Sequence, residues 1–259
     1  LDEVRAALDL AELPGDMTVS SDGIVVCGGP IGTPDFVAEF VRDQVATKTA
    51  ALPYVQAMES VQNQCYFLSN SLAKNFVHVM RLTPCGGDSR AGAELAKWDA
   101  QLNGLLEQIA GTRELDDFSR GIAALSQADG GLGLTPTRQL ADPCLIAGKF
   151  AAARAVDGCA PLDLAVASLL DPSTDPTYAT EIAVHQAIDR LDDIKPGLRE
   201  KLAGSESNGA IRQQRALKSE VSGALKADLL VGRSSDFDPR TRALMRSNAG
   251  NPHVLASPH

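Results

Sequence analysis

Apolar residues recur at helical intervals along most of the chain. Between residues 53 and 82 they stand three or four positions apart throughout, which predicts one long helix. The same spacing predicts helices over 34–50, 91–110 and 137–156, the first of them opened by Thr33 as N-cap. Ala and Leu are abundant and aromatic residues make up only 4% of the chain, a composition that favours helices.

The N-terminal part combines a helical pattern with a short extended one. Residues 1–13 have the apolar spacing of an amphipathic helix. Met17–Val19 and Ile24–Val26 are extended runs on either side of Asp22–Gly23, a dipeptide typical of tight reversals. We therefore expect a small β-hairpin ahead of the helices.

These patterns predict a mainly α fold, a helical bundle-like region with one small N-terminal β-hairpin. Proline stops divide the last hundred residues into shorter helical patterns. The expected organisation has four parts: residues 1–33 with a helix end and the hairpin, 34–160 as a helical domain, 161–246 as a C-terminal helical region, and 247–259 as a loose tail.

Charge sets a first limit on partners. The formal net charge is −9, from 33 acidic and 24 basic residues, so the chain as a whole is a poor match for a phosphate backbone. Residues 205–246 depart from this balance, with eight basic and five acidic residues. Any contact with nucleic acid is therefore expected to be local.

Cysteine usage indicates a reducing, intracellular compartment. The five cysteines are widely spaced and form no C-x-x-C pair, so neither a disulfide framework nor a zinc site is predicted. No apolar run approaches the roughly 18 residues needed to cross a bilayer, so we expect no membrane partner. No histidine pair has metal-ligand spacing, and we expect no metal and no cofactor.

The motifs suggestive of chemistry have plainer interpretations. The glycines of 28–32 and 131–136 lack the spacing of phosphate-binding loops and are interpreted as turns. Cys27 has no resolving cysteine nearby and is interpreted as a small buried hydrophobe. Asp116–Asp117 and Asp192–Asp193 are interpreted as solvated faces rather than metal ligands. No catalytic residue is predicted.

One basic stripe stands out near the C-terminal end. Arg212, Arg215 and Lys218 are spaced i, i+3, i+6 within 211–226, opposite an apolar face. Such a stripe can hold phosphates, and it can equally be the wet side of a surface helix. Both interpretations remain open on the sequence.

The order of several short motifs resembles a known family. The segments "GIVVCGGPIGTPDFV", "NSLAKNFVHVMRLTP", "AKWDAQL", "GGLGL" and "RALMRSNAGNPHVLASP" follow one another along nearly the whole chain. This order is similar to the region downstream of the catalytic palm in reverse transcriptases of non-LTR-type retroelements. Each motif is weakly specific, and their shared order is the stronger signal.

The resemblance implies a role for each segment. The hairpin of residues 24–31 would seat the primer end, with Gly28 and Gly29 letting the backbone approach the duplex. The helices after it would form the thumb, and Lys74 and Arg81 would contact the nucleic-acid backbone together with the basic stripe. The implied partners are an RNA/DNA primer–template duplex and the polymerase palm upstream in the parent chain.

The family's catalytic motif has no counterpart in this sequence. No aromatic-x-Asp-Asp carboxylate pair occurs, so the resemblance implies a non-catalytic thumb and C-terminal fragment of an RNA-directed DNA polymerase. The rival hypothesis is a helical protein–protein interaction module whose Ala/Leu faces bind a partner. A small enzyme with an unrecognised site is a third hypothesis, and nothing in the spacing favours it.

Overall fold

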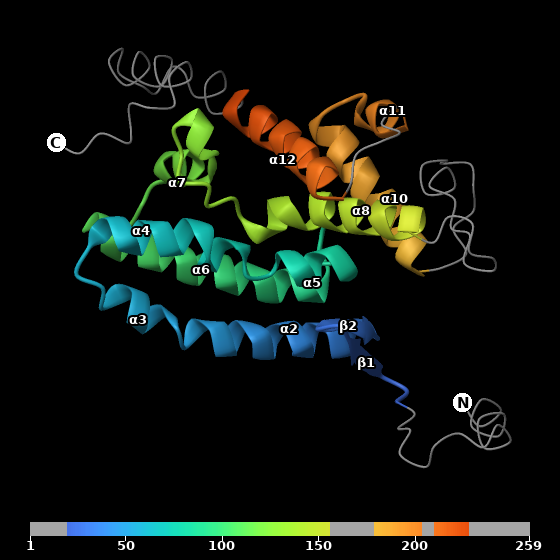
Figure 1. Ribbon diagram of the computed structural model, residues 1–259, viewed down its shortest axis with the longest axis horizontal. Coiled ribbons are helices and arrows are strands. Elements are labelled where there is room, and N and C mark those ends of the chain that lie inside the picture. Colours follow the sequence, from blue (N-terminus) through green and yellow to red (C-terminus); the bar gives the residue numbers. More distant parts are fainter. Residues whose placement is uncertain (1–19, 156–178, 204–209, 228–259) are drawn as a thin grey trace, which may run out of the picture.

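The computed structural model describes residues 20–155, 179–203 and 210–227, and it is mainly helical with a small N-terminal hairpin, as the sequence predicts (Figure 1). The predictions for residues 1–19 and for the tail 247–259 lie outside these ranges. The described elements are β1 (Gly23–Val26), β2 (Gly29–Gly32), α2 (Pro34–Thr49), α3 (Leu52–Gln56), α4 (Val61–Asn70), η1 (Leu72–Lys74), α5 (Val77–Leu82), α6 (Arg90–Ala110), α7 (Asp117–Ala124), η2 (Gln127–Asp129), α8 (Thr137–Ala155), α10 (Ala179–Ile194), α11 (Leu198–Ala203) and α12 (Ala210–Ala227).

The hairpin reverses at a different place from the one predicted. β1 and β2 are antiparallel, and the turn between them is made by Cys27 and Gly28, whose φ angles are +50° and +77°. Two successive positive φ angles match the twist of paired strands. The predicted reversal at Asp22–Gly23 is wrong, because Asp22 lies at the open end of the hairpin and its carbonyl accepts the Thr33 amide at 2.6 Å. Met17–Val19 lies outside the described residues.

Helices α2 and α6 confirm the predicted boundaries. The Thr33 hydroxyl accepts the Phe36 amide at 3.3 Å at the start of α2. The Ser89 hydroxyl accepts the Gly92 amide at 3.0 Å at the start of α6. Side-chain caps of this kind satisfy amides that the first helical turn leaves without partners.

The single long helix expected over 53–82 is wrong, because that stretch is divided into α3, α4, η1 and α5. The Ser60 hydroxyl accepts the Asn63 amide and so begins α4 anew. The Gln64 amide group donates to the carbonyls of Gln56 and Met58, at 3.0 and 2.8 Å, across the same break. Apolar periodicity continues through these breaks, so it gives no sign of them.

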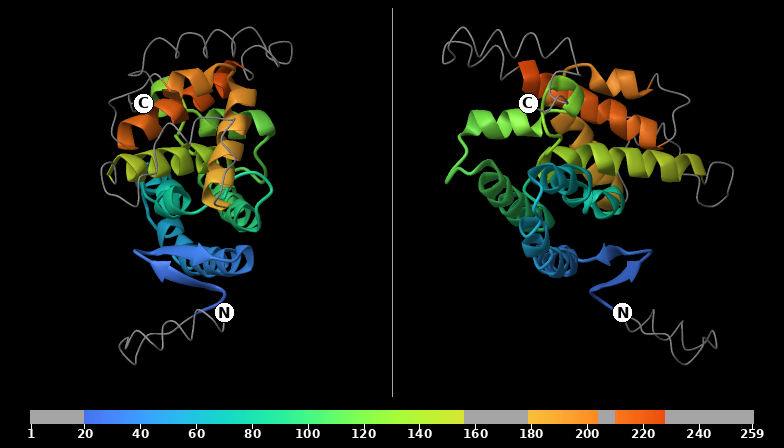
Figure 2. Two further views of the ribbon diagram at one scale, coloured as in Figure 1. Left: turned by 90° about the vertical axis from the view of Figure 1, so that its right-hand side faces the viewer. Right: turned by 60° about the vertical axis from the view of Figure 1, so that its left-hand side comes forward.

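The helices lie in three layers (Figures 1 and 2). The lowest layer in Figure 1 holds α2, α3 and the hairpin, and the middle one holds α4, α5 and α6. Above them lie α8, α10, α11 and α12. Helix α8 packs against α5 and α6 of the middle layer and against α10 and α12 of the upper layer, so it joins the two layers.

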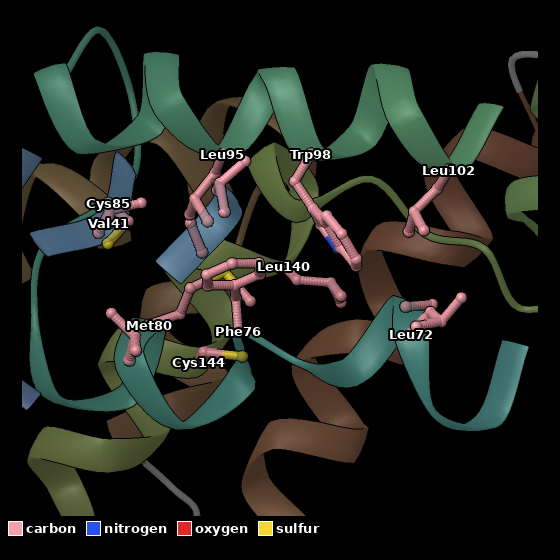
Figure 3. Packing of buried hydrophobic residues seen from close by; sticks show 14 of the residues in the cluster. Val41, Leu72, Phe76, Met80, Cys85, Leu95, Trp98, Leu102, Leu140 and Cys144 are labelled. Atoms are coloured by element: carbon pink, nitrogen blue, oxygen red, sulfur yellow. The ribbon is translucent and has the colours of Figure 1, made fainter. Parts of the chain in front are cut away.

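Two apolar clusters meet on α8. The first fills the space between α2, α5 and α6, where the rings of Phe76 and Trp98 meet edge to face with centroids 5.7 Å apart (Figure 3). The second lies between α8, α10 and α12 and includes Phe150, which is fully buried. Gly148 lets α8 approach α5, since a Cβ at this position would lie 2.3 Å from the Arg81 carbonyl oxygen.

Candidate nucleic-acid interface

The hairpin is held against α5 by three side chains. The His78 ring bonds through Nε2 to the Cys27 carbonyl oxygen at 2.8 Å, which fixes the turn. The Thr83 hydroxyl donates to the Pro30 carbonyl at 2.9 Å, and Leu82 packs against the backbone of Gly29. The position of the turn is therefore set by α5 as well as by the hairpin's own sequence.

The two predicted glycines have different surroundings. Gly28 is exposed at the turn with a positive φ, which side chains rarely adopt. Gly29 is buried, and a Cβ there would lie 2.4 Å from Cδ1 of Leu82. Cys27 is exposed, so its interpretation as a buried hydrophobe is wrong. Its position at the two-residue turn projects it away from the core.

A pocket of about 400 Å³ opens beside β2 and the end of α5. It is lined partly by Lys149 of α8, whose ammonium donates to the Leu82 carbonyl at 3.0 Å. Burial lowers the pKa of Lys149, because the charged form is poorly solvated there. The Leu82 carbonyl thus ties α8 to the element that carries the hairpin.

Helix α5 also connects the hairpin to α12. Arg81 stands one turn after His78, and its Nε donates to the Gln214 side-chain oxygen of α12 at 2.8 Å. The Gln214 amide group in turn lies 3.1 Å from Sγ of Cys144 on α8. Residues 81 and 214 are therefore neighbours in space, although 133 positions separate them in the sequence.

Lys74 on η1 and Lys218 on α12 lie near each other, although they are far apart in the sequence. Burial lowers the pKa of half-buried Lys218, and the nearby charge of Lys74 lowers it further. Arg215 precedes Lys218 by one turn and is exposed. The stripe is therefore not uniformly on the wet side of α12, since Arg215 is exposed and Lys218 is half-buried. The side chain of Arg212 lies outside the described residues.

We call Lys74, Arg81, Arg215 and Lys218 the cation group. Within the part of the chain that the structure describes, these four side chains form no ion pair with a carboxylate, whereas other cations such as Arg42, Lys97 and Arg190 do. The segment of residues 60–87, which supplies Lys74 and Arg81, contains no Asp or Glu, although the chain has 33 of them. The positive potential of the cation group is therefore not cancelled by its own segment.

The two buried cysteines among the described residues are poorly suited to nucleophilic chemistry. Burial is the main cause that raises the pKa of both Cys85 and Cys144 to about 12, so both remain protonated near neutral pH. Among the described residues, no cluster of three or more His, Cys, Asp or Glu side chains could hold a metal ion. Within the same ranges, no helix is both long and apolar enough to cross a membrane.

Sequence reasoning missed the residues that position the predicted ones. The spacing of His78 suggests neither a catalytic nor a metal-binding role, and Gln214 reads as part of a polar helix face. A local signal existed for His78, since His78 and Leu82 are four positions apart and share a helix face. The Arg81–Gln214 contact had no such signal, because it depends on how α8 packs between two helices.

Comparison with protein-family models, with curated proteins and with solved structures gives no match to this chain.

Proposed function

We propose that this chain is the non-catalytic, thumb-like region of a non-LTR-type retroelement reverse transcriptase, and that it holds primer–template nucleic acid without performing chemistry itself. The cation group is the observation that carries the proposal, since part of it lies on the helix that also fixes the hairpin. The order of the sequence motifs is independent support.

The geometry suits a clamp on a phosphate backbone. Lys74 and Arg215 are exposed cations from separate helices, and Arg81 and Lys218 are half-buried. Contacts to phosphate position a duplex without reading its sequence, and they release bound counterions. A clamp of this kind needs local positive charge rather than a basic protein, which is compatible with the net charge of −9.

The hairpin would present its backbone to the primer end. Its tip is fixed by His78, and Gly28 carries no side chain at the second position of the turn. In the parent polymerase the chemistry would belong to the palm upstream, and the contribution of this region would be orientation of the primer hydroxyl. We expect Gly29→Val to displace the hairpin, because the added side chain would collide with Leu82.

The decisive experiment is binding of a labelled primer–template duplex, followed by fluorescence anisotropy between about 50 and 200 mM salt. We expect affinity to fall with salt, with a log–log slope of about −2 to −4 for two to four phosphate contacts. Arg215→Glu and Lys74→Glu should each weaken binding and reduce the slope by about one or more, with helicity unchanged by circular dichroism. The matched control is Arg113→Glu, which reverses the charge of an exposed residue outside the cation group.

A duplex affinity that does not change with salt concentration contradicts the proposal. So does an affinity that Arg113→Glu lowers as much as Arg215→Glu does.

One observation favours the second candidate, a protein–protein interaction module. Ile24, Val25 and Ile31 of the hairpin are between 50% and 57% exposed, which leaves apolar surface on the hairpin for a partner. Under the first proposal that surface is available to the palm. Salt-insensitive association with protein and no duplex binding would favour the second.

A further inference from the structure

The outer face of α4 carries exposed aromatic side chains in a chain that has few. Tyr66 is 64% exposed and Phe67 is 42% exposed, whereas Phe76 and Trp98 are fully buried. The rings of Tyr66 and Phe67 meet edge to face with centroids 6.1 Å apart, so each restricts the other's orientation. The pair presents preformed aromatic faces to whatever approaches α4.

The Phe67 ring stands on a line of exposed side chains that leads to the cation group. Asn63, Phe67, Asn70 and Lys74 follow one another at intervals of three or four positions, and all four are exposed. The Lys74 ammonium donates to the Asn70 side-chain oxygen at 3.1 Å. Lys74 also lies close enough to Lys218 to affect its ionisation. The line therefore runs from the Phe67 ring through the Asn70 amide to Lys74, and Lys218 on α12 lies next to it.

The charge of this surface indicates the chemical class of its ligand. α4, η1 and α5 lie in the acid-free segment of residues 60–87, so a polyanion meets no carboxylate of that segment along the line. An apolar protein partner has no need of the neighbouring uncompensated cations. Unpaired bases combine the required properties, since they stack on aromatic rings, bond to amides and carry phosphates.

We propose that Tyr66 and Phe67 form a stacking platform for unpaired bases of a single-stranded nucleic acid whose phosphates continue onto the cation group. This proposal rests on the proposed function and adds to it a class of ligand, the unpaired strand next to the duplex. Asn63 and Asn70 stand on the same line as Phe67, and their amide groups would bond to the edges of the bases. The platform tolerates any base, because every base has a stacking face.

The test compares two probes, a labelled single-stranded oligodeoxythymidylate and a blunt DNA duplex of the same length. We expect Tyr66→Ala with Phe67→Ala to weaken single-strand binding by about tenfold or more and to leave duplex binding within about twofold. The conservative pair Tyr66→Phe with Phe67→Tyr should restore single-strand binding, because the rings are kept. Ile194→Ala is the matched control, since Ile194 is an exposed apolar residue at the end of α10.

A direct readout of stacking comes from Phe67→Trp. The natural Trp98 is buried, so the new indole would be the exposed one, and stacking with thymine should quench its fluorescence. Quenching by the single strand and none by the blunt duplex supports the platform. Single-strand affinity unchanged by loss of both rings, or equal losses for the two probes, overturns it.

The outcomes also separate this proposal from the proposed function. Salt-dependent duplex binding together with single-strand affinity that ignores the rings would overturn the platform alone. Single-strand binding that needs the rings, with no duplex binding, would sustain the platform and overturn the duplex clamp. Self-association that Tyr66→Ala with Phe67→Ala abolishes, without binding of either probe, would assign the face to a second copy of the chain and overturn both.

Discussion

The two sides of α8 each contact an arginine, and the partners of the two arginines differ in charge. On one side, the Asp142 carboxylate accepts from Arg190 of α10 at 2.7 and 2.9 Å, and the pair is neutral as a whole. On the other side, Arg81 meets the uncharged side chain of Gln214, which in turn meets Cys144. Asp142 and Cys144 are only two positions apart on the same helix, so a single element separates a neutralised cation from an available one.

Net charge is therefore a poor guide to a local surface. The side of α8 that faces α10 uses its arginine for cohesion, because a half-buried guanidinium with a bidentate carboxylate is satisfied by the protein itself. The side that faces α5 and α12 holds cations whose hydrogen bonds go to neutral groups. Their charge remains to be met from outside the described residues.

The strongest effect should come from disturbing the helix contact on which both sides depend. Gly148→Val places a side chain against α5, since a Cβ at this position would lie 2.3 Å from the Arg81 carbonyl oxygen. Because the obstacle is backbone, α5 must move away from α8, and we expect a loss of about 3 kcal/mol or more in the free energy of unfolding. Chemical denaturation measures it.

The control for that substitution is Gly104→Ala in α6, where an added Cβ meets nothing within 4 Å. Alanine should be neutral or stabilising by up to about 1 kcal/mol, since it favours helix. A Gly148→Val protein as stable as the parent would show that α5 and α8 are not in close contact.

Removal of the neutralising carboxylate should cost less. Asp142→Asn leaves Arg190 half-buried without its counter-charge, and we expect a loss of about 2 kcal/mol, reduced from the value for a fully buried pair because Arg190 is partly exposed. Asp88→Asn, which breaks an exposed pair with Arg138, should have no measurable effect. Equal destabilisation by the two substitutions would be incompatible with the described packing.

The opposite kind of substitution adds a carboxylate beside Arg81, which lacks one among the described residues. Gln214→Glu keeps the size of the side chain and gives Arg81 an anionic partner. We expect unchanged helicity, about tenfold weaker duplex binding and a salt slope reduced by about one. Gln186→Glu on α10 adds the same charge at an exposed position and should leave binding nearly unchanged. Equal effects of the two variants would mean that net charge alone controls binding.

A weaker effect is expected from pH, through the titration of Lys218. Its surroundings include Lys74 on η1 and Cys144 on α8, and burial is the larger cause of its lowered pKa. As pH rises, Lys218 should lose its proton before an exposed lysine does, so affinity for the duplex should fall by a few-fold. Lys218→Arg should remove this decline, because arginine stays charged.

The stability of the free protein should respond to pH with the opposite sign. The folded-state pKa of Lys218 lies below its unfolded value, so the unfolded chain binds more protons between the two values. The contribution of Lys218 to stability therefore improves as pH rises through that window. If duplex affinity and stability change in the same direction as pH rises, the decline in affinity comes from a group other than Lys218.

Elements that depend on neighbours along the chain could be predicted from the sequence alone. The hydroxyl cap at Thr33 and the apolar spacing that begins at residue 91 place the starts of α2 and α6, and the same kind of spacing predicts α8. These signals are local, since a cap needs a side chain within one turn and an amphipathic face needs a repeat of three or four. The mainly helical class follows from them.

The surroundings of the candidate residues, in contrast, depend on tertiary packing. The hairpin turns at Cys27 and Gly28 rather than at Asp22–Gly23, and α5 holds that turn through His78. Arg81 and Gln214 meet across 133 positions because α8 packs between their helices, and Lys218 becomes half-buried. Such contacts depend on the relative placement of whole helices, which is set by the burial of apolar faces and leaves no trace in the spacing of the charged residues themselves.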